Sequence, residues 1–173
     1  MKRIFFIIFG MVCIAAQAQQ VNFPGNFIGK WAGKLQWMAE GKPAEEFNMQ
    51  LIIEPADTAG QYTWQIIYGD EGKDNRPYLL KPVDTAKGHW VVDEGDGIVL
   101  DNYVHGNAIH GAFTVLDNTV IDNYTFANGI LIVEFLSIKL ADKKTSGRGT
   151  EDTPFVDSYK ITSYQTGVLH KVD

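Results

Sequence analysis

From about residue 27 onward, apolar and polar residues alternate one by one over short stretches, and turn-forming residues interrupt the alternation. The stretches are rich in Val, Ile, Thr, Tyr, Phe and Trp, which favour β-strands, and no long stretch has the 3.6-residue spacing of an amphipathic helix. Short strands with close turns bury one face by curling into a closed sheet, so the pattern predicts an all-β fold: a single antiparallel up-and-down β-barrel of about ten strands. The predicted strands are 27–38, 47–54, 61–68, 78–86, 89–94, 98–105, 108–116, 119–127, 130–140 and 155–168.

Three short turns predict how four of these strands pair. Asn-Gly at 128–129 is a strong two-residue hairpin signal, and Gly-Asn at 106–107 and Asp-Asn at 117–118 are weaker ones. The loops that join the other strands are short, except for two long polar stretches at 69–77 and 141–154. The turns predict these opposite pairs: Val104 with Ile109, Asn102 with Gly111, Phe113 with Asp122, Gly111 with Tyr124, Tyr124 with Val133, and Asp122 with Phe135.

Side chains alternate between the two faces of a strand, so each predicted pair also assigns a face. All three turns agree on one mainly apolar face, which we expect to be the barrel interior. The opposite face collects polar side chains, among them His105 and His110. The predicted interior face holds Ile98, Leu100, Asn102, Val104, Ile109, Gly111, Phe113, Val115, Val120, Asp122, Tyr124, Phe126, Leu131, Val133 and Phe135.

Two histidines lie close together in the segment YVHGNAIHG, residues 103–111. The predicted hairpin makes His105 and His110 diagonal neighbours on the outer, polar face. A transition-metal site needs a third ligand nearby, and Asp101 and Tyr103 on the same face allow no more than a weak, adventitious site. We therefore predict solvated surface histidines and no metal site.

The predicted interior also contains polar groups, namely Asn102, Asp122 and Tyr124 on neighbouring strands, with Gly111 among them. A buried carboxylate without a partner costs several kcal/mol and usually takes up a proton or gains a hydrogen bond. One interpretation is a small polar cluster in an apolar ligand cavity, with space above Gly111. The other is that Tyr124 simply satisfies Asp122 near one end of the barrel.

The first eighteen residues have the order of a secretory signal peptide: Lys2 and Arg3, then an apolar run, then Ala16-Gln17-Ala18. The apolar run is shorter than the ~20 residues of a membrane-spanning helix. We expect cleavage after Ala18, a single β-barrel domain over 19–173, and a secreted or periplasmic location with no membrane span. The chain has 15 basic and 21 acidic residues, a balance that disfavours binding to nucleic acid.

The first predicted strand contains Gly29, Trp31 and Gly33 in the order G-x-W-x-G. This resembles the first strand of lipocalin-like (calycin) barrels, and the fuller motif is similar to nitrobindin-type haem-binding barrels and secreted bacterial lipocalin-like domains. The resemblance implies a barrel with Trp31 at its floor, and makes His170 a candidate haem ligand. The chain departs from the pattern in having no clear counterpart of the lipocalin arginine that packs over the tryptophan.

The chain has no G-x-S-x-G, P-loop, dinucleotide glycine motif, H-E-x-x-H or C-x-x-C, so nothing in the sequence favours an enzyme. The sequence favours a non-enzymatic protein that binds a small, largely apolar or amphipathic molecule inside the barrel. The alternatives are a haem-binding barrel that uses His170, and a barrel with a filled core that binds other proteins through its loops. The candidate ligand-binding residues are Trp31, Asn102, Gly111, Phe113, Asp122, Tyr124, Phe126 and Phe135.

Overall fold

The computed structural model describes residues 22–69, 72 and 74–173, and the predicted signal peptide lies outside them. The described chain forms ten strands and two short 3-10 helices, so the predicted all-β fold is confirmed. Each predicted strand is present, with ends that differ by a few residues. The elements are η1 (Gly25–Phe27), β1 (Gly29–Ala39), β2 (Glu45–Ile53), β3 (Tyr62–Tyr68), β4 (Asp74–Asp84), η2 (Thr85–Lys87), β5 (His89–Asp93), β6 (Val99–His105), β7 (Ala108–Val115), β8 (Asn118–Ala127), β9 (Ile130–Ser146) and β10 (Val156–Val172).

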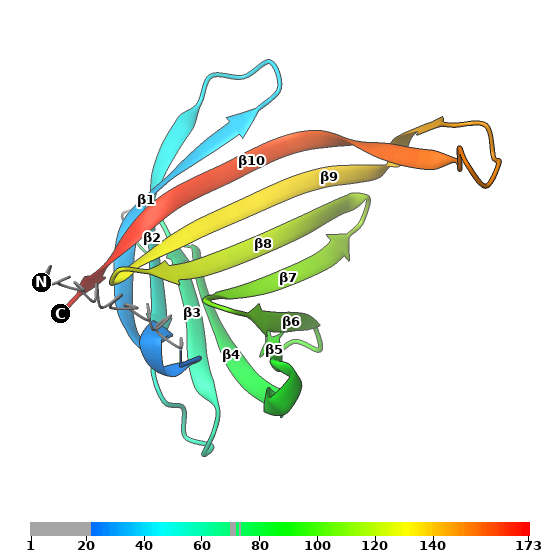
Figure 1. Cartoon of the computed structure of the whole chain (residues 1–173). Helices are drawn as coiled ribbons and strands as arrows, with labels where there is room; N and C mark the ends of the chain where they lie inside the picture. Colours follow the sequence, from blue (N-terminus) through cyan, green and yellow to red (C-terminus); the bar gives the residue numbers. More distant parts are fainter. Residues whose placement is uncertain (1–21, 70–71, 73) are drawn as a thin grey trace, which may run out of the picture.

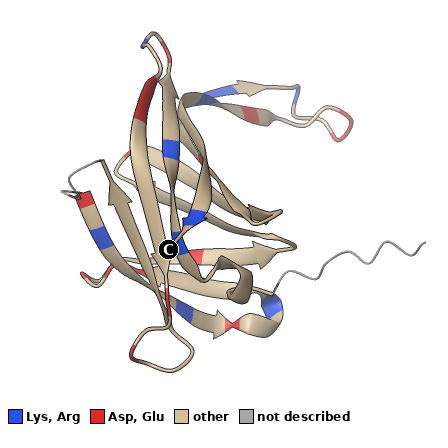
Figure 2. Cartoon of the chain, turned by 90° about the vertical axis from the view of Figure 1, so that its left-hand side faces the viewer, with Lys and Arg blue, Asp and Glu red and all other residues tan. Residues whose placement is uncertain are grey.

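The ten strands form one closed antiparallel barrel in which every strand pairs with its neighbours in sequence (Figure 1). Pairing of β1 with β10 closes the sheet, with Lys30 opposite Val172 at one end of the ladder and Ala39 opposite Ser163 at the other. Consecutive antiparallel strands need only short connections, as predicted for an up-and-down barrel. Charged residues of both signs are scattered over the strands and loops (Figure 2).

The predicted pairing of β6 with β7 and of β8 with β9 is confirmed, including Val104 opposite Ile109 and Tyr124 opposite Val133. The predicted pairing of β7 with β8 is wrong by two residues. Asp122 lies opposite Gly111, rather than opposite Phe113.

The hairpin turn between β7 and β8 explains this shift. Val115 pairs with Asn118, so the turn residues are Leu116 and Asp117, one residue earlier than predicted. Leu116 adopts a φ of 56°, a left-handed conformation that is uncommon for a bulky residue. Moving the turn by one position changes the register by two, which keeps each side chain on its predicted face.

One end of the barrel is filled by a tightly packed core beneath η1. The indole nitrogen of Trp31 donates a 2.7 Å hydrogen bond to the carbonyl oxygen of Phe27, and both side chains are fully buried. Phe126 packs on both, with ring centroids 6.0 Å from Phe27 and 6.2 Å from Trp31. Leu131 and Leu169 complete this plug, which places Trp31 at the barrel floor, as the resemblance implied.

Strands β9 and β10 extend beyond the barrel as a two-stranded arm, residues 140–162 with their connecting turn (Figure 1). The last pair of β9 with β8 is Lys139 with Asn118, and the last pair of β10 with β1 is Ser163 with Ala39. The expected long loop at 141–154 is therefore shorter, because residues 141–146 belong to β9. Irregularities in the β9–β10 ladder between Ser158 and Ser163 mark the base of the arm.

Candidate functional site

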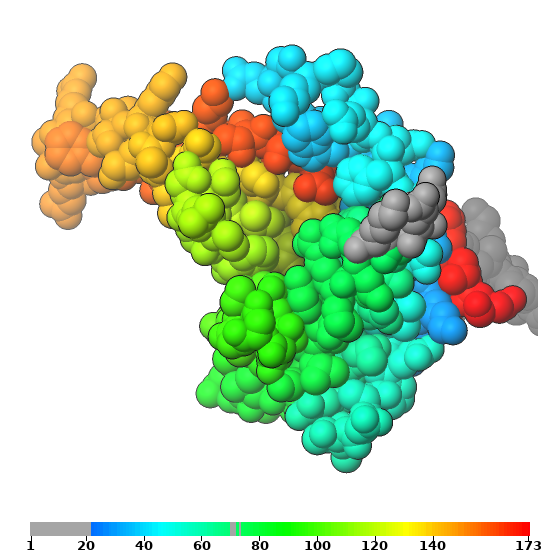
Figure 3. Space-filling view, turned by 180° about the vertical axis from the view of Figure 1, so that it is seen from behind, coloured from blue at the N-terminus to red at the C-terminus, as the bar shows by residue number. Residues whose placement is uncertain are grey.

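The end of the barrel opposite the plug contains a cavity of about 420 Å³. This volume falls within the range of about 300–1,000 Å³ that is common for small-molecule sites. Ile98 and Val115 line the cavity and are about half exposed, so they mark its mouth. In the space-filling view, the yellow strand β9 is recessed between the yellow-green β7–β8 hairpin and the green region of β4 to β6 (Figure 3). The cavity is lined by Trp64, Ile66, Tyr68, Arg76, Tyr78, Val92, Glu94, Ile98, Leu100, Asn102, Phe113, Val115, Val120, Asp122, Tyr124, Phe135, Ser137 and Gln165.

Five of the eight candidate ligand-binding residues line this cavity: Asn102, Phe113, Asp122, Tyr124 and Phe135. They come from four adjacent strands, β6 to β9, and the alternation of each strand points them inward. The other three lie elsewhere. Trp31 and Phe126 belong to the plug, and Gly111 forms the backbone between Asn102 and Asp122 on the neighbouring strands.

The expected empty space above Gly111 is occupied. A Cβ atom placed on Gly111 would lie 2.3 Å from Oδ1 of Asp122 and 2.8 Å from Oδ1 of Asn102. Both distances are shorter than a normal van der Waals contact. The missing side chain therefore makes room for the two polar groups, and the open volume lies further along the barrel.

Asp122 is the carboxyl group of this polar cluster, and it is buried. Its side chain is only 9% exposed, and its Oδ1 atom is buried with no hydrogen-bond partner among the described residues. Burial raises the pKa of the carboxyl to about 6, although the backbone N–H of Asp122 and the nearby His110 oppose the shift. A carboxyl in this state changes its charge with small changes in its surroundings, which is typical of functional sites.

Tyr124 packs among aromatic rings on the inner wall. Its ring meets Trp64 edge to face at 4.9 Å and Phe135 at 5.7 Å. Burial raises the pKa of Tyr124 well above its usual range, and the negative charge of Asp122 adds to this. Since Oδ1 of Asp122 has no partner, the interpretation that Tyr124 satisfies this atom is not supported.

Arg76 is a cavity residue that the sequence analysis missed, because it lies within the stretch 69–77 that was expected to be a loop. Its guanidinium forms two 2.8 Å hydrogen bonds to Asp74 and lies 5.0 Å from the ring of Tyr68. Burial raises the pKa of Tyr68 to about 12. The spacing of Arg76, Tyr78 and Leu80 on alternate positions was a signal that the strand begins earlier.

The histidines near the β6–β7 turn lie on the outer face, as predicted. His105 is exposed, and its ring centroid is 5.7 Å from that of His110. Nδ1 of His110 is 2.6 Å from Oδ1 of Asn123. Within the described residues, no group of three or more histidine, cysteine, aspartate or glutamate side chains is arranged to hold a metal ion.

His170 lies on the outer surface of β10 and is exposed, because its neighbour Leu169 points into the plug. Its partners across the sheet are Ala32 and Ile130, at the end of the barrel away from the cavity. A haem inside the cavity would therefore be out of reach of this imidazole. The structure gives no support to His170 as an interior haem ligand.

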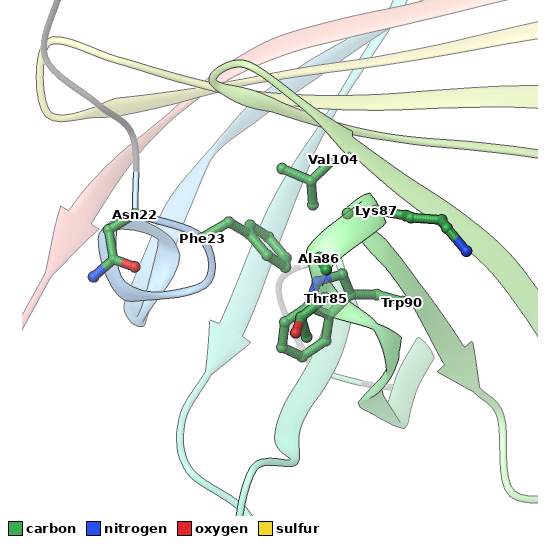
Figure 4. A pocket seen from close by; sticks show the side chains of 8 residues that line it. Asn22, Phe23, Thr85, Ala86, Lys87, Trp90 and Val104 are labelled. Carbon is green, nitrogen blue, oxygen red and sulfur yellow. The ribbon is translucent and has the colours of Figure 1, made fainter.

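A second hollow, of about 670 Å³, lies outside the plugged end, between the N-terminal segment and η2 (Figure 4). Phe23 reaches across it and meets Trp90 edge to face at 5.2 Å. The side chain of Lys87 extends away from the hollow, and its ammonium pairs with Asp84 at 3.0 Å. Among the described residues that line the hollow, none is a buried polar residue, so the interior cavity is the stronger candidate site.

Comparisons with known proteins agree with the fold. No protein-family model matches the chain, and no curated protein matches it at a significant level. A solved structure of a protein of unknown function from the DUF3598 family of Nostoc punctiforme PCC 73102 is similar, with a TM-score of 0.64 and 10% sequence identity. The match covers 90% of this chain and 51% of that one, so this chain spans about half its length. At this identity the likeness shows the fold alone, a closed ten-strand barrel that fits a calycin-like architecture.

None of the helices in the described part of the chain is both long and apolar enough to cross a membrane.

Proposed function

We propose that this protein binds a small, largely apolar molecule in the interior of its barrel and does so without chemical conversion. The observation that carries the proposal is the cavity of about 420 Å³ with a mouth at one end and a packed plug at the other. Protein interiors are normally close-packed, and unfilled apolar volume lowers stability. A cavity of this size is therefore better explained by a cargo than by the needs of folding.

The composition of the walls supports the same function. Aromatic and aliphatic side chains make up most of the lining, and a few polar groups are placed among them. Ligand sites commonly have this arrangement, in which apolar area supplies affinity and a few polar groups fix orientation. The signal-like sequence at residues 1–18 supports a role outside the cytoplasm, in the periplasm or in the medium.

Two experiments test this function. Native mass spectrometry of protein purified from its own host should show a retained small molecule. In parallel, the apolar fluorophore N-phenylnaphthylamine should gain fluorescence on adding the protein, because it leaves water for an apolar cavity.

A cavity-filling variant makes the fluorophore test specific. Ser137 lines the cavity, so Ser137→Phe should abolish the fluorescence gain. Leu136→Phe places a ring on the outer face of the same strand and should leave the gain unchanged. Equal fluorescence in both variants, or no retained molecule and no fluorescence in the wild type, would contradict binding in the interior.

A further inference from the structure

Two hydrogen-bond acceptors lie side by side over Gly111 and fill the room that its missing side chain leaves. The Asn102 amide is oriented by a 3.1 Å hydrogen bond from its Nδ2 to the carbonyl oxygen of Leu100. Its Oδ1 therefore points toward Gly111, where Oδ1 of Asp122 also lies. Asp122 Oδ1 receives no hydrogen bond from the described residues. The cluster is thus short of a donor.

The charged side chains around the cavity also favour a positively charged ligand. Among the described lining residues, the charged side chains are Arg76, Glu94 and Asp122. Arg76 is already bound by both oxygens of Asp74 at 2.8 Å, so its charge is largely compensated. The two carboxyl groups leave the interior with an excess of negative charge, which favours a cation and disfavours an anion.

Aromatic rings surround the acidic group. Trp64, Tyr124 and Phe135 pack edge to face in a continuous cluster beside Asp122, and all four line the cavity. Ring faces attract a desolvated cation, and the attraction is strongest for Trp. An acidic acceptor within an aromatic wall suits a molecule that has an apolar body and a positively charged donor.

We propose that the cavity selects molecules with a protonated amine on an aromatic or aliphatic body, and that the amine is held by Asp122 and Asn102. This inference rests on the proposed function, since it names the chemical class of the cargo. An ammonium on the cavity side of the Asp122 carboxyl donates to a group that is short of donors and neutralises the carboxylate at once. An alcohol would supply only the donor, and a carboxylate would place like charges together.

A matched series of probes tests this selectivity. Tryptamine, tryptophol and indolepropionate share an indole body and differ in the charge of the polar end. Hexylamine, hexanol and hexanoate repeat the comparison on an aliphatic body. In isothermal titration calorimetry at neutral pH, each amine should bind at least about tenfold more tightly than its alcohol, the scale of a charged hydrogen bond, and the acids should bind weakest.

A variant assigns the preference to one carboxyl. Asp122→Asn should lower amine affinity about tenfold or more and leave alcohol affinity nearly unchanged. Asp57→Asn, which removes an exposed carboxylate from the β2–β3 loop, should leave both unchanged. Alcohols that bind as tightly as the amines, or amines that fail to bind at millimolar concentration, would overturn the inference. The proposed function is decided separately, because N-phenylnaphthylamine is uncharged and its entry does not depend on Asp122.

Discussion

Asp122 lies directly opposite Gly111 in the β7–β8 ladder, and its carboxyl oxygen occupies the space that a side chain on Gly111 would need. The two residues are complementary: the glycine supplies the room, and the acid fills it together with Asn102. This places an ionisable group on the inner wall between the plug and the open cavity.

Gly111→Ala should therefore destabilise the protein by about 1–3 kcal/mol, the usual cost of forcing an extra group into a packed site. The φ of Gly111 is not in the left-handed region, so the cost comes from contacts rather than from backbone strain. Urea unfolding measures it. In an Asp122→Ala background the same substitution should cost clearly less, and additive effects in the double variant would contradict a direct contact.

The stability contribution of Asp122 should depend on pH in a defined direction. Its pKa in the folded protein is about 6, above the value near 4 of an unfolded chain, so the folded state binds the proton more tightly. Stability from this group is present below about pH 4 and is lost as the pH rises through about 6. Asn at position 122 cannot ionise, so the variant does not lose this stability as the pH rises. The free energy of unfolding of Asp122→Asn minus that of wild type should therefore increase by up to roughly 3 kcal/mol between pH 4 and pH 7.

Urea unfolding at several pH values measures that difference. Asp57→Asn removes one exposed carboxylate and corrects for the change in net charge. A difference between Asp122→Asn and wild type that stays constant with pH would contradict a buried, ionisable carboxyl.

A mutation in the plug should lower stability and should leave ligand binding in the cavity unchanged. Trp31→Phe removes the hydrogen bond to the Phe27 carbonyl and part of a fully buried ring, so it should cost at least about 1–3 kcal/mol. It should not change the affinity for an interior probe, because Trp31 does not line the cavity. Trp37→Phe, at a half-buried position on the same strand, should cost less than about 1 kcal/mol. Loss of binding in Trp31→Phe without loss of stability would contradict this division.

The outer histidines should affect stability little and ligand binding not at all. His105→Ala should change the free energy of unfolding by about 0.5 kcal/mol or less, as is usual for exposed sites. His110→Ala should cost about 1 kcal/mol because it removes the contact with Asn123. Thermal and urea unfolding of the single variants give both values. A stoichiometric metal that is lost in the double variant would show that the two rings form a site after all.

The alternating pattern was enough to predict the barrel, its strands and the inward face. It succeeded because alternation reports directly on which side of a sheet is buried. The pattern also predicted that Asn102, Asp122 and Tyr124 lie close together on the inner face. It did not predict the correct partner of Asp122, since a shift of two residues preserves the faces, and a Leu at positive φ in the turn gives no sequence signal.

Two other differences arise from information that strand patterns do not contain. Whether an inward-pointing residue belongs to the plug or lines the cavity depends on its position along the barrel axis. The alternation of apolar and polar residues gives no information on that position. Trp31 and Phe126 point inward as predicted, yet they lie at the filled end. Arg76 was assigned to a loop because charged and glycine residues precede it, although pairing with β3 extends β4 through it.

The arm formed by residues 140–162 differs from the barrel in how its backbone is protected. In the closed sheet each strand has a partner on both sides, whereas each arm strand pairs only with the other. Amide hydrogens on its outer edges can therefore exchange with solvent without any opening of the barrel. Unpaired edges also invite strand addition from other chains, and the lysines and ladder irregularities of the arm oppose it. Within the barrel β9 and β10 each have partners on both sides, so the outer edges of these two strands become exposed only in the arm.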